Sequence, residues 1–260
     1  MRKKKIIKSE KVEKVVSPVI VTGIVLASMP VGEYDKRVVL LTKERGKITA
    51  FAKGARKQNS ALLACAQPFT FGQFTIYEGR TSYQVNGCDV QNYFVELRNN
   101  LEAVTYGLYF CEFAEYLTRE NVDESAILKL LYQSLRALTK GTIPYPLIRY
   151  IFELKMMTLN GEAVQVFECV KCGKKEKLNA LSLSSGGLVC SDCLTKEVRV
   201  IHLQDSTIYA MQFIIASSIE KLYTFTVSDS VLSELRYCMK HYLTMYIDKE
   251  FKTLEMLDMF

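Results

Sequence analysis

Two pairs of cysteines in the second half of the chain have the residue types and spacing of a metal site. Two residues separate Cys169 from Cys172, two separate Cys190 from Cys193, and 17 residues lie between the pairs. This spacing lets each pair hold one edge of a tetrahedral ion, and it is typical of a four-cysteine zinc site. Four thiolates leave no open coordination position, so we expect one structural zinc ion per chain.

Disulfide bonds and a redox-active Cys-x-x-Cys are the alternatives for these cysteines. Two pairs at this spacing favour zinc over both. Gly173 follows the first pair and Gly186–Gly187 precedes the second, and glycines permit the tight turns that such pairs need. Neither pair has the H-x-E and P-C-x-x-C context of a zinc deaminase, and the chain has no GxxxxGK[ST] phosphate loop. We therefore expect no enzymatic activity.

A second distinctive stretch runs from residue 32 to residue 57 and predicts a hairpin. Val38–Leu41 is an apolar run that suits a buried strand, and Glu44–Gly46 has the composition of a turn. Residues 47–53 then alternate, with Ile48, Ala50 and Ala52 on one face and two lysines, Lys47 and Lys53, on the other, which predicts a strand with one cationic face. Such a surface suits phosphate groups. The candidate DNA contacts are Lys43, Arg45, Lys47, Lys53, Arg56 and Lys57.

The charge of the chain is unevenly distributed. The formal net charge is +6, but residues 1–60 hold fifteen lysines and arginines against five acidic residues. The other 200 residues carry a net charge of −4. This asymmetry indicates that the N-terminal part binds a polyanion, with a basic tail that aids solubility as the alternative.

The same segments carry a resemblance to a known family. The chain resembles the bacterial RecO family of recombination mediators from about Val19 to about Cys193, and the last sixty residues match only in general character. The matching segments are GIVL at 23–26, GEYDKRVVLLTKERGKI at 32–48, AKGARK at 52–57, QPF at 67–69, FELK at 152–155, Gly161, CVKCG at 169–173 and GGLVCSDC at 186–193.

This resemblance implies a function in DNA repair and homologous recombination. A RecO-like protein binds single- and double-stranded DNA, anneals complementary strands and works with RecR to load RecA onto DNA coated by single-strand-binding protein. The resemblance also implies a groove in the helical part for the acidic C-terminal tail of single-strand-binding protein. Its carboxylate needs a cation beside an apolar pocket. The candidates are Arg119, Arg136, Arg149 and Lys155.

Periodicity predicts an α+β chain with several domains. Five short strands between residues 19 and 94 predict a small barrel; the first is expected at Val19–Ser28, and Gly87 could bend the last. The resemblance selects the five-stranded OB type. Apolar stripes at helical spacing follow at 101–117 and 127–138, with Lys140–Gly141 as a stop, and helix resumes after residue 205 with a break at Ser217–Ser218 or at Thr226–Asp229. We expect a basic arm at 1–16, an OB-type DNA-binding domain at 17–96, a helical domain at 97–164 and 201–260, and an inserted zinc ribbon at 165–200.

Two further questions are open at this level. Phe51 lies on the cationic face of the hairpin, where it could stack on a base or be covered by the helical domain.

No apolar run reaches the ~20 residues of a membrane span. Glu10–Lys14 separates the basic start of the chain from the apolar stretch that follows, which is unlike a signal peptide. We expect a cytoplasmic, nucleoid-associated protein. The alternative function is a zinc-ribbon interaction module with a non-specific nucleic-acid-binding arm.

Overall fold

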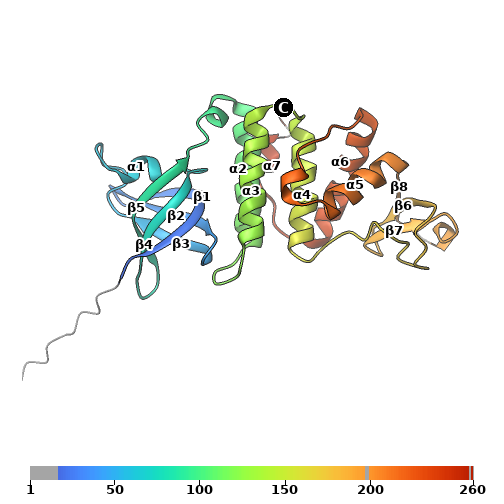
Figure 1. The fold of residues 1–260 in the computed structure, drawn as a ribbon, viewed down its shortest axis with the longest axis horizontal. Coiled ribbons are helices and arrows are strands. Elements are labelled where there is room, and N and C mark those ends of the chain that lie inside the picture. The colour runs from blue at the N-terminus through green and yellow to red at the C-terminus, as the bar shows by residue number, and fades with distance from the viewer. Residues whose placement is uncertain (1–16, 197–198, 258, 260) are drawn as a thin grey trace, which may run out of the picture.

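Five strands in the first third of the chain close into a barrel (Figure 1). The computed structural model describes residues 17–196, 199–257 and 259, so the arm expected at residues 1–16 lies outside the described residues. A short helix, α1 (Leu62–Cys65), lies between the third and fourth strands. The strands are β1 (Val19–Val31), β2 (Asp35–Thr42), β3 (Gly46–Ala52), β4 (Phe71–Glu78) and β5 (Tyr83–Asn92).

The strand order around the barrel is β1-β2-β3-β5-β4, and only the β3–β5 pair is parallel. This closed five-stranded arrangement confirms the predicted OB-type fold. Along β3 the alternation is as predicted, because Ile48, Ala50 and Ala52 are buried inside the barrel. The other side of β3 therefore forms part of the outer surface.

The β1–β2 hairpin is longer than the sequence predicts. β1 extends to Val31, beyond the predicted end at Ser28, and pairs with β2 up to Val31 and Asp35. Gly32 adopts a φ of +57° in the connecting turn. In β5, Gly87 lies next to a shift in the pairing register with β4, which agrees with the predicted bend at this glycine.

Helices form the middle of the molecule. Asn100 caps the N-terminus of α2 by accepting a hydrogen bond from the Ala103 amide, and Gly141, with a φ of +62°, ends α3 where the sequence predicts a stop. The break predicted at Ser217–Ser218 or at Thr226–Asp229 extends over both positions, because α5 ends at Ala216 and α6 begins at Asp229. The helices are α2 (Leu101–Leu117), α3 (Ser125–Lys140), α4 (Tyr145–Leu159), α5 (Asp205–Ala216), α6 (Asp229–Tyr246) and α7 (Lys252–Leu257).

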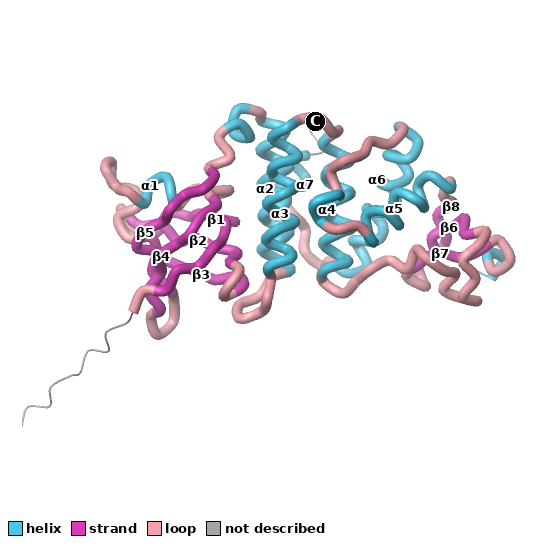
Figure 2. The backbone as a smooth tube through the Cα atoms, viewed as in Figure 1, coloured by secondary structure: helices cyan, strands magenta, loops and turns pink. Residues whose placement is uncertain are grey.

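The parts of the molecule follow one another along its length. Helices α2 and α3 lie next to the barrel, α4 to α6 lie beyond them, and a small sheet lies at the far end (Figures 1 and 2). The outward side chains of β2, Val39 and Leu41, belong to the same apolar core as the helices. That face of the barrel is therefore buried against the helical part. Helix α7, which comes last in the sequence, packs on α2, the first long helix.

The small sheet has three strands in the order β7-β6-β8. Its strands are β6 (Leu178–Ser182), β7 (Gly187–Cys190) and β8 (Val200–His202). Buried residues such as Ala180 and Leu188 continue the core of the helices. Across the described residues, none of the helices is both long enough and apolar enough to cross a membrane.

Candidate metal centre and nucleic-acid interface

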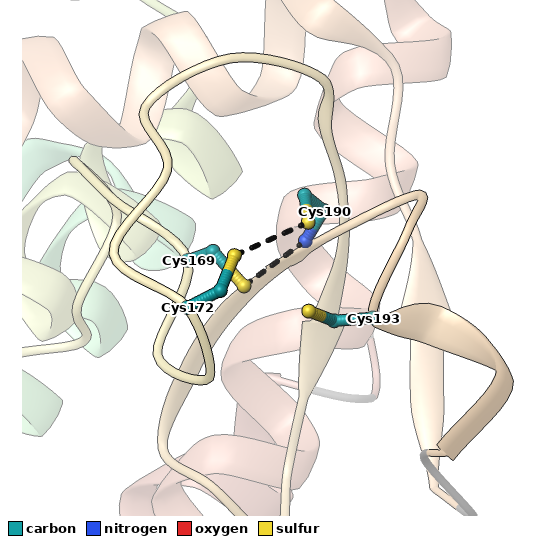
Figure 3. Close-up of side chains that lie close together, drawn as sticks. All are labelled: Cys169, Cys172, Cys190 and Cys193. Atoms are coloured by element: carbon teal, nitrogen blue, oxygen red, sulfur yellow. Dashed lines mark hydrogen bonds between the residues drawn. The ribbon is translucent and has the colours of Figure 1, made fainter.

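The four cysteines predicted as ligands come together at the far end of the molecule (Figure 3). Cys169 and Cys172 lie in the loop before β6, Cys190 ends β7, and Cys193 lies in the turn that follows. Their sulfur atoms all lie within 4.8 Å of one another. The geometry confirms that these residues form one group able to hold a metal ion.

Each cysteine pair lies in a hydrogen-bonded turn. The Gly173 amide donates to the Cys169 carbonyl at 2.8 Å, and Gly173 has a φ of +73°, as expected for the glycine after the first pair. The Cys193 amide donates to the Cys190 carbonyl at 3.0 Å. Gly187 has a different role, because a Cβ there would lie 2.5 Å from Val170 Cγ1. The two turns can therefore approach closely only with glycine at this position.

Distances within the group fit a tetrahedral ion. The Sγ atoms of Cys172 and Cys190 are 3.7 Å apart, close to the ~3.8 Å edge that follows from Zn–S bonds of about 2.3 Å. A disulfide needs a separation of about 2.0 Å. Burial raises the pKa of Cys169, but hydrogen bonds from backbone amides, including that of Cys190 at 3.4 Å, outweigh it and lower this pKa to about 6. The local backbone thus favours a thiolate, the form that binds metal.

The ribbon is attached to the helices by direct contacts. Gln212 on α5 donates to the Val166 carbonyl at 2.7 Å, and the Tyr242 hydroxyl on α6 donates to the carbonyl of Glu162, just before the ribbon, at 3.0 Å. The ribbon therefore packs on the helical part and does not project freely from it.

The six candidate DNA contacts separate into two groups. The turn group comprises Lys43, Arg45 and Lys47 around the β2–β3 turn, and the exit group comprises Lys53, Arg56 and Lys57 after β3. Lys53 follows Lys47 by six positions, and six steps of extended strand span about 20 Å. The structure therefore does not bring the six cations into one cluster.

The turn group lies against the helical part. The Lys47 amide donates to the Arg119 carbonyl at 2.9 Å, and the Lys47 ammonium donates to the Glu115 carbonyl. Arg45 forms an ion pair with Glu78 at 3.5 Å. Burial lowers the pKa of Lys47. Two of these three cations are thus engaged within the protein, while Lys43 is exposed.

The exit group is exposed and lies beside the β1–β2 turn. The Arg56 guanidinium donates to the Gly32 carbonyl at 3.1 Å, and the Lys57 ammonium lies 5.5 Å from the ring centroid of Tyr34. None of the three has an ion pair among the described residues. These cations are therefore available to a phosphate backbone.

Two further cations extend the exit group and were not among the predicted contacts. Arg37 is exposed and pairs across the hairpin with Phe51. Burial lowers the pKa of Lys36, and the charge of Arg56 lowers it further, which shows that these two cations lie close together. A signal was present in the sequence, because a hairpin places the start of β2 opposite the end of β3. Phe51 itself is half-buried.

The four cations considered for a tail-binding groove have different environments. Arg149 donates to buried Glu153 at 2.7 Å, and Lys155 donates to three backbone carbonyls near the end of α5. Arg119 is exposed next to the barrel. Arg136 lines a cavity of about 320 Å³ together with Lys140, Ile143 and Tyr223.

Comparison with known proteins agrees with this architecture. The family model described as Recombination protein O N terminal matches residues 17–94, and the model described as Recombination protein O C terminal matches residues 98–255. The DNA repair protein RecO of Acetivibrio thermocellus is 32% identical over 238 residues, covering 91% of this chain and 94% of the relative. The protein of the same name from Alkaliphilus metalliredigens is 33% identical over 236 residues, covering 90% and 96%. The chain therefore belongs to the RecO family.

Proposed function

We propose that this protein acts in DNA repair and homologous recombination by holding DNA on the outer surface of its barrel. One observation carries this proposal: the exit group and Arg37 form an exposed cationic surface with no ion pair among the described residues. Family membership supports the wider role, since the relatives are named DNA repair proteins.

The proposed mechanism needs no covalent chemistry. Lysine and arginine side chains neutralise phosphates and release counterions, so single- and double-stranded DNA both bind with little sequence preference. Neutralisation also lowers the repulsion between two complementary strands, which favours annealing, and base pairing supplies the specificity. In this proposal the protein works with RecR to load RecA onto DNA covered by single-strand-binding protein.

A triple substitution of the exit group tests the barrel as the DNA site. Lys53→Glu, Arg56→Glu and Lys57→Glu together should weaken binding to all sequences alike. The salt slope is the slope of log K, the logarithm of the binding constant, against the logarithm of the salt concentration. Each lost phosphate contact should reduce its magnitude by ~0.9 on duplex and by ~0.7 on single strands. The measurement is fluorescence anisotropy against salt concentration. The proposal fails if the slope is unchanged.

A charge-matched variant on the helical part is the control. Three exposed cations lie outside the barrel: Lys221, Arg236 and Lys240. Changing all three to Glu should alter the salt slope far less than the exit-group triple substitution does. Deleting residues 1–16 tests the alternative in which a basic arm carries the DNA binding. Retained affinity after this deletion favours the barrel.

We infer that the four-cysteine group holds a structural zinc ion. Four sulfur ligands select zinc or iron–sulfur chemistry over hard cations, and a single closed tetrahedral site suits zinc. The ion would link the loop before β6 to the end of β7 and the turn that follows it. Its predicted effect on folding is described in the Discussion.

The cavity beside Arg136 is the best-placed groove for the acidic tail of single-strand-binding protein. It combines two cations with the apolar surface of Ile143 and Tyr223, whereas Arg149 and Lys155 are occupied within the protein. A labelled tail peptide should bind at low salt and lose affinity in Arg136→Glu. Absence of binding to the unmodified protein at low salt excludes this groove.

A further inference from the structure

The turn between β1 and β2 carries an exposed patch of large side chains. Tyr34 is 46% exposed, Met29 is 41% exposed and Val31 is 40% exposed. These three residues lie at the tip of the hairpin, at the end of the barrel where the exit group lies. These side chains contribute little to the core, and their position beside the exit group leaves them accessible to a ligand bound there.

Hydrogen bonds hold this turn firmly against the end of β3. The Arg56 amide donates to the Tyr34 carbonyl at 2.8 Å, and the Arg56 side chain donates to the Gly32 carbonyl at 3.1 Å. The Asp35 carboxylate accepts from the Gly54 amide at 2.7 Å. The backbone on both sides of Tyr34 is therefore fixed before any ligand arrives, which lowers the entropic cost of binding.

One cation lies close to the Tyr34 ring, and a second contacts the backbone beside it. The Lys57 ammonium lies 5.5 Å from its centroid, and Arg56 lies in the same network of contacts. A hydrogen bond with Glu33, followed by a smaller effect of burial, raises the pKa of Tyr34, so the hydroxyl stays protonated at neutral pH. An aromatic ring beside phosphate-binding cations is the combination that single-strand-binding surfaces use.

We propose that Tyr34 is a stacking platform for an unpaired nucleobase, and that the β1–β2 turn thereby gives the barrel a preference for single-stranded over duplex DNA. This inference rests on the DNA binding proposed above. Bases in a duplex already stack on their neighbours, so they offer no free face to the ring. An unpaired base next to phosphates held by Lys57 and Arg56 can place its face on Tyr34.

The test compares single-stranded and duplex probes of the same length. Tyr34→Ala should raise the Kd for single strands by about 5- to 150-fold, the range that corresponds to loss of one base–aromatic stack. The Kd for duplex should change by less than about twofold, and the salt slope should stay unchanged on both probes because no charge is lost. Tyr34→Phe keeps the ring and should retain single-strand affinity.

A spectroscopic measurement and a matched variant complete the experiment. A single-stranded probe containing 2-aminopurine should be quenched by the unmodified protein and by Tyr34→Phe, but not by Tyr34→Ala. Tyr237 is 53% exposed on α6, and Tyr237→Ala should leave both affinities unchanged. The stacking role is overturned if Tyr34→Ala loses affinity equally for both probes, or if it loses no affinity for single strands. If the stacking role fails but the exit-group triple variant still reduces the salt slope, the proposal that the barrel binds DNA stands without a stacking role for Tyr34.

Discussion

A buried ionic group joins α2 to α4. Glu153 is fully buried, and its Oε1 atom accepts hydrogen bonds from the Tyr109 hydroxyl at 2.6 Å and from Arg149 Nε at 2.7 Å. Burial of the phenol, with a further effect of the Glu153 charge, raises the pKa of Tyr109 well above its usual value. These two donors offset part of the cost of burying the carboxylate, whose Oε2 atom has no hydrogen-bond partner among the described residues.

Removing the cation should therefore destabilise the protein strongly. Arg149→Met leaves the Glu153 carboxylate buried with only the tyrosine donor, and we expect a loss of about 3–5 kcal/mol in the free energy of unfolding. Urea unfolding at pH 7 measures this. Arg136→Met is the control, because Arg136 is exposed and its change should cost less than about 0.5 kcal/mol. Equal effects of the two substitutions would show that the buried pair contributes nothing.

The positions of these residues show which parts of the site can be predicted from sequence. The cysteine group follows from spacing alone, because each pair is a local turn and Gly173 has the positive φ that its position suggests. The separation of the hairpin cations into an engaged turn group and an exposed exit group could not be predicted. It depends on contacts of Lys47 with Glu115 and Arg119, which lie some seventy residues away in the sequence.

At the level of elements, the ribbon should depend on its metal for folding. Its three strands have only five, four and three residues, and metal binding adds the free energy that holds the cysteine loops against them. Cys169→Ser should reduce the zinc content measured by elemental analysis and lower the thermal stability of the ribbon. Cys238→Ser, which changes a buried helical cysteine outside the group, should leave the zinc content unchanged. Protein purified without chelator that contains no zinc would exclude a zinc site.

Helix α7 is held against α2 by a carboxylate whose state depends on pH. Glu112 accepts hydrogen bonds from the Thr253 hydroxyl and the Thr253 amide, and Lys249 lies 3.3 Å away. Burial raises the pKa of Glu112, but these bonds and the Lys249 charge outweigh burial and lower the pKa below its usual value.

This lowered pKa predicts a pH-dependent stability. Because the folded-state pKa is depressed, the contribution of Glu112 is present above the unfolded pKa of ~4.3 and is lost as the pH falls through the folded value. Glu112→Gln should thus lower the free energy of unfolding by about 1 kcal/mol at pH 7 and have almost no effect at pH 2. Urea unfolding at both pH values is the measurement, with exposed Glu96→Gln as the control. A difference that persists at pH 2 contradicts the role of the charge.

The strands and helices themselves were largely predictable. β2, β3, α2 and α3 begin and end within a few residues of their predicted limits, since alternation, apolar stripes and glycine stops are local signals. The return of α7 to α2 was not predictable. Its apolar contact through Phe251 joins parts of the chain more than a hundred residues apart, and no pattern within one segment specifies such a pairing.

The position of the barrel relative to the helices depends on the β2–β3 turn. Besides the Lys47 contacts, the Asn121 amide donates to the Arg45 carbonyl at 2.9 Å, and Gly46 forms a β-bridge with Glu120. Together with Val39 and Leu41 in the shared core, these bonds fix the barrel on the α2–α3 connection. The turn group at this end of β3 is in contact with the helical part, whereas the exit group at the other end of β3 stays exposed. Docking of the barrel through the turn group therefore leaves the exit group facing solvent.

Substituting Gly46 tests this docking. A Cβ at Gly46 would lie 2.3 Å from the Arg119 carbonyl oxygen and 2.7 Å from that of Val122, and φ is +65°. Gly46→Ala should therefore cost about 2–5 kcal/mol, the sum of left-handed strain and overpacking. Gly32→Ala is a matched control, because Gly32 has a φ of +57° but no atom within 4 Å of the added Cβ. It should cost only the strain, about 1–2 kcal/mol.

The two variants also separate docking from barrel folding. If the turn anchors the barrel, Gly46→Ala should expose the connection between β5 and α2, residues 93–100, to limited proteolysis, whereas Gly32→Ala should not. DNA binding by the exit group should survive in Gly46→Ala, because those cations lie at the opposite end of β3. Equal unfolding free energies and equal cleavage rates for the two variants would show that strain alone matters at Gly46. The barrel would then be held mainly by the apolar contacts of Val39 and Leu41.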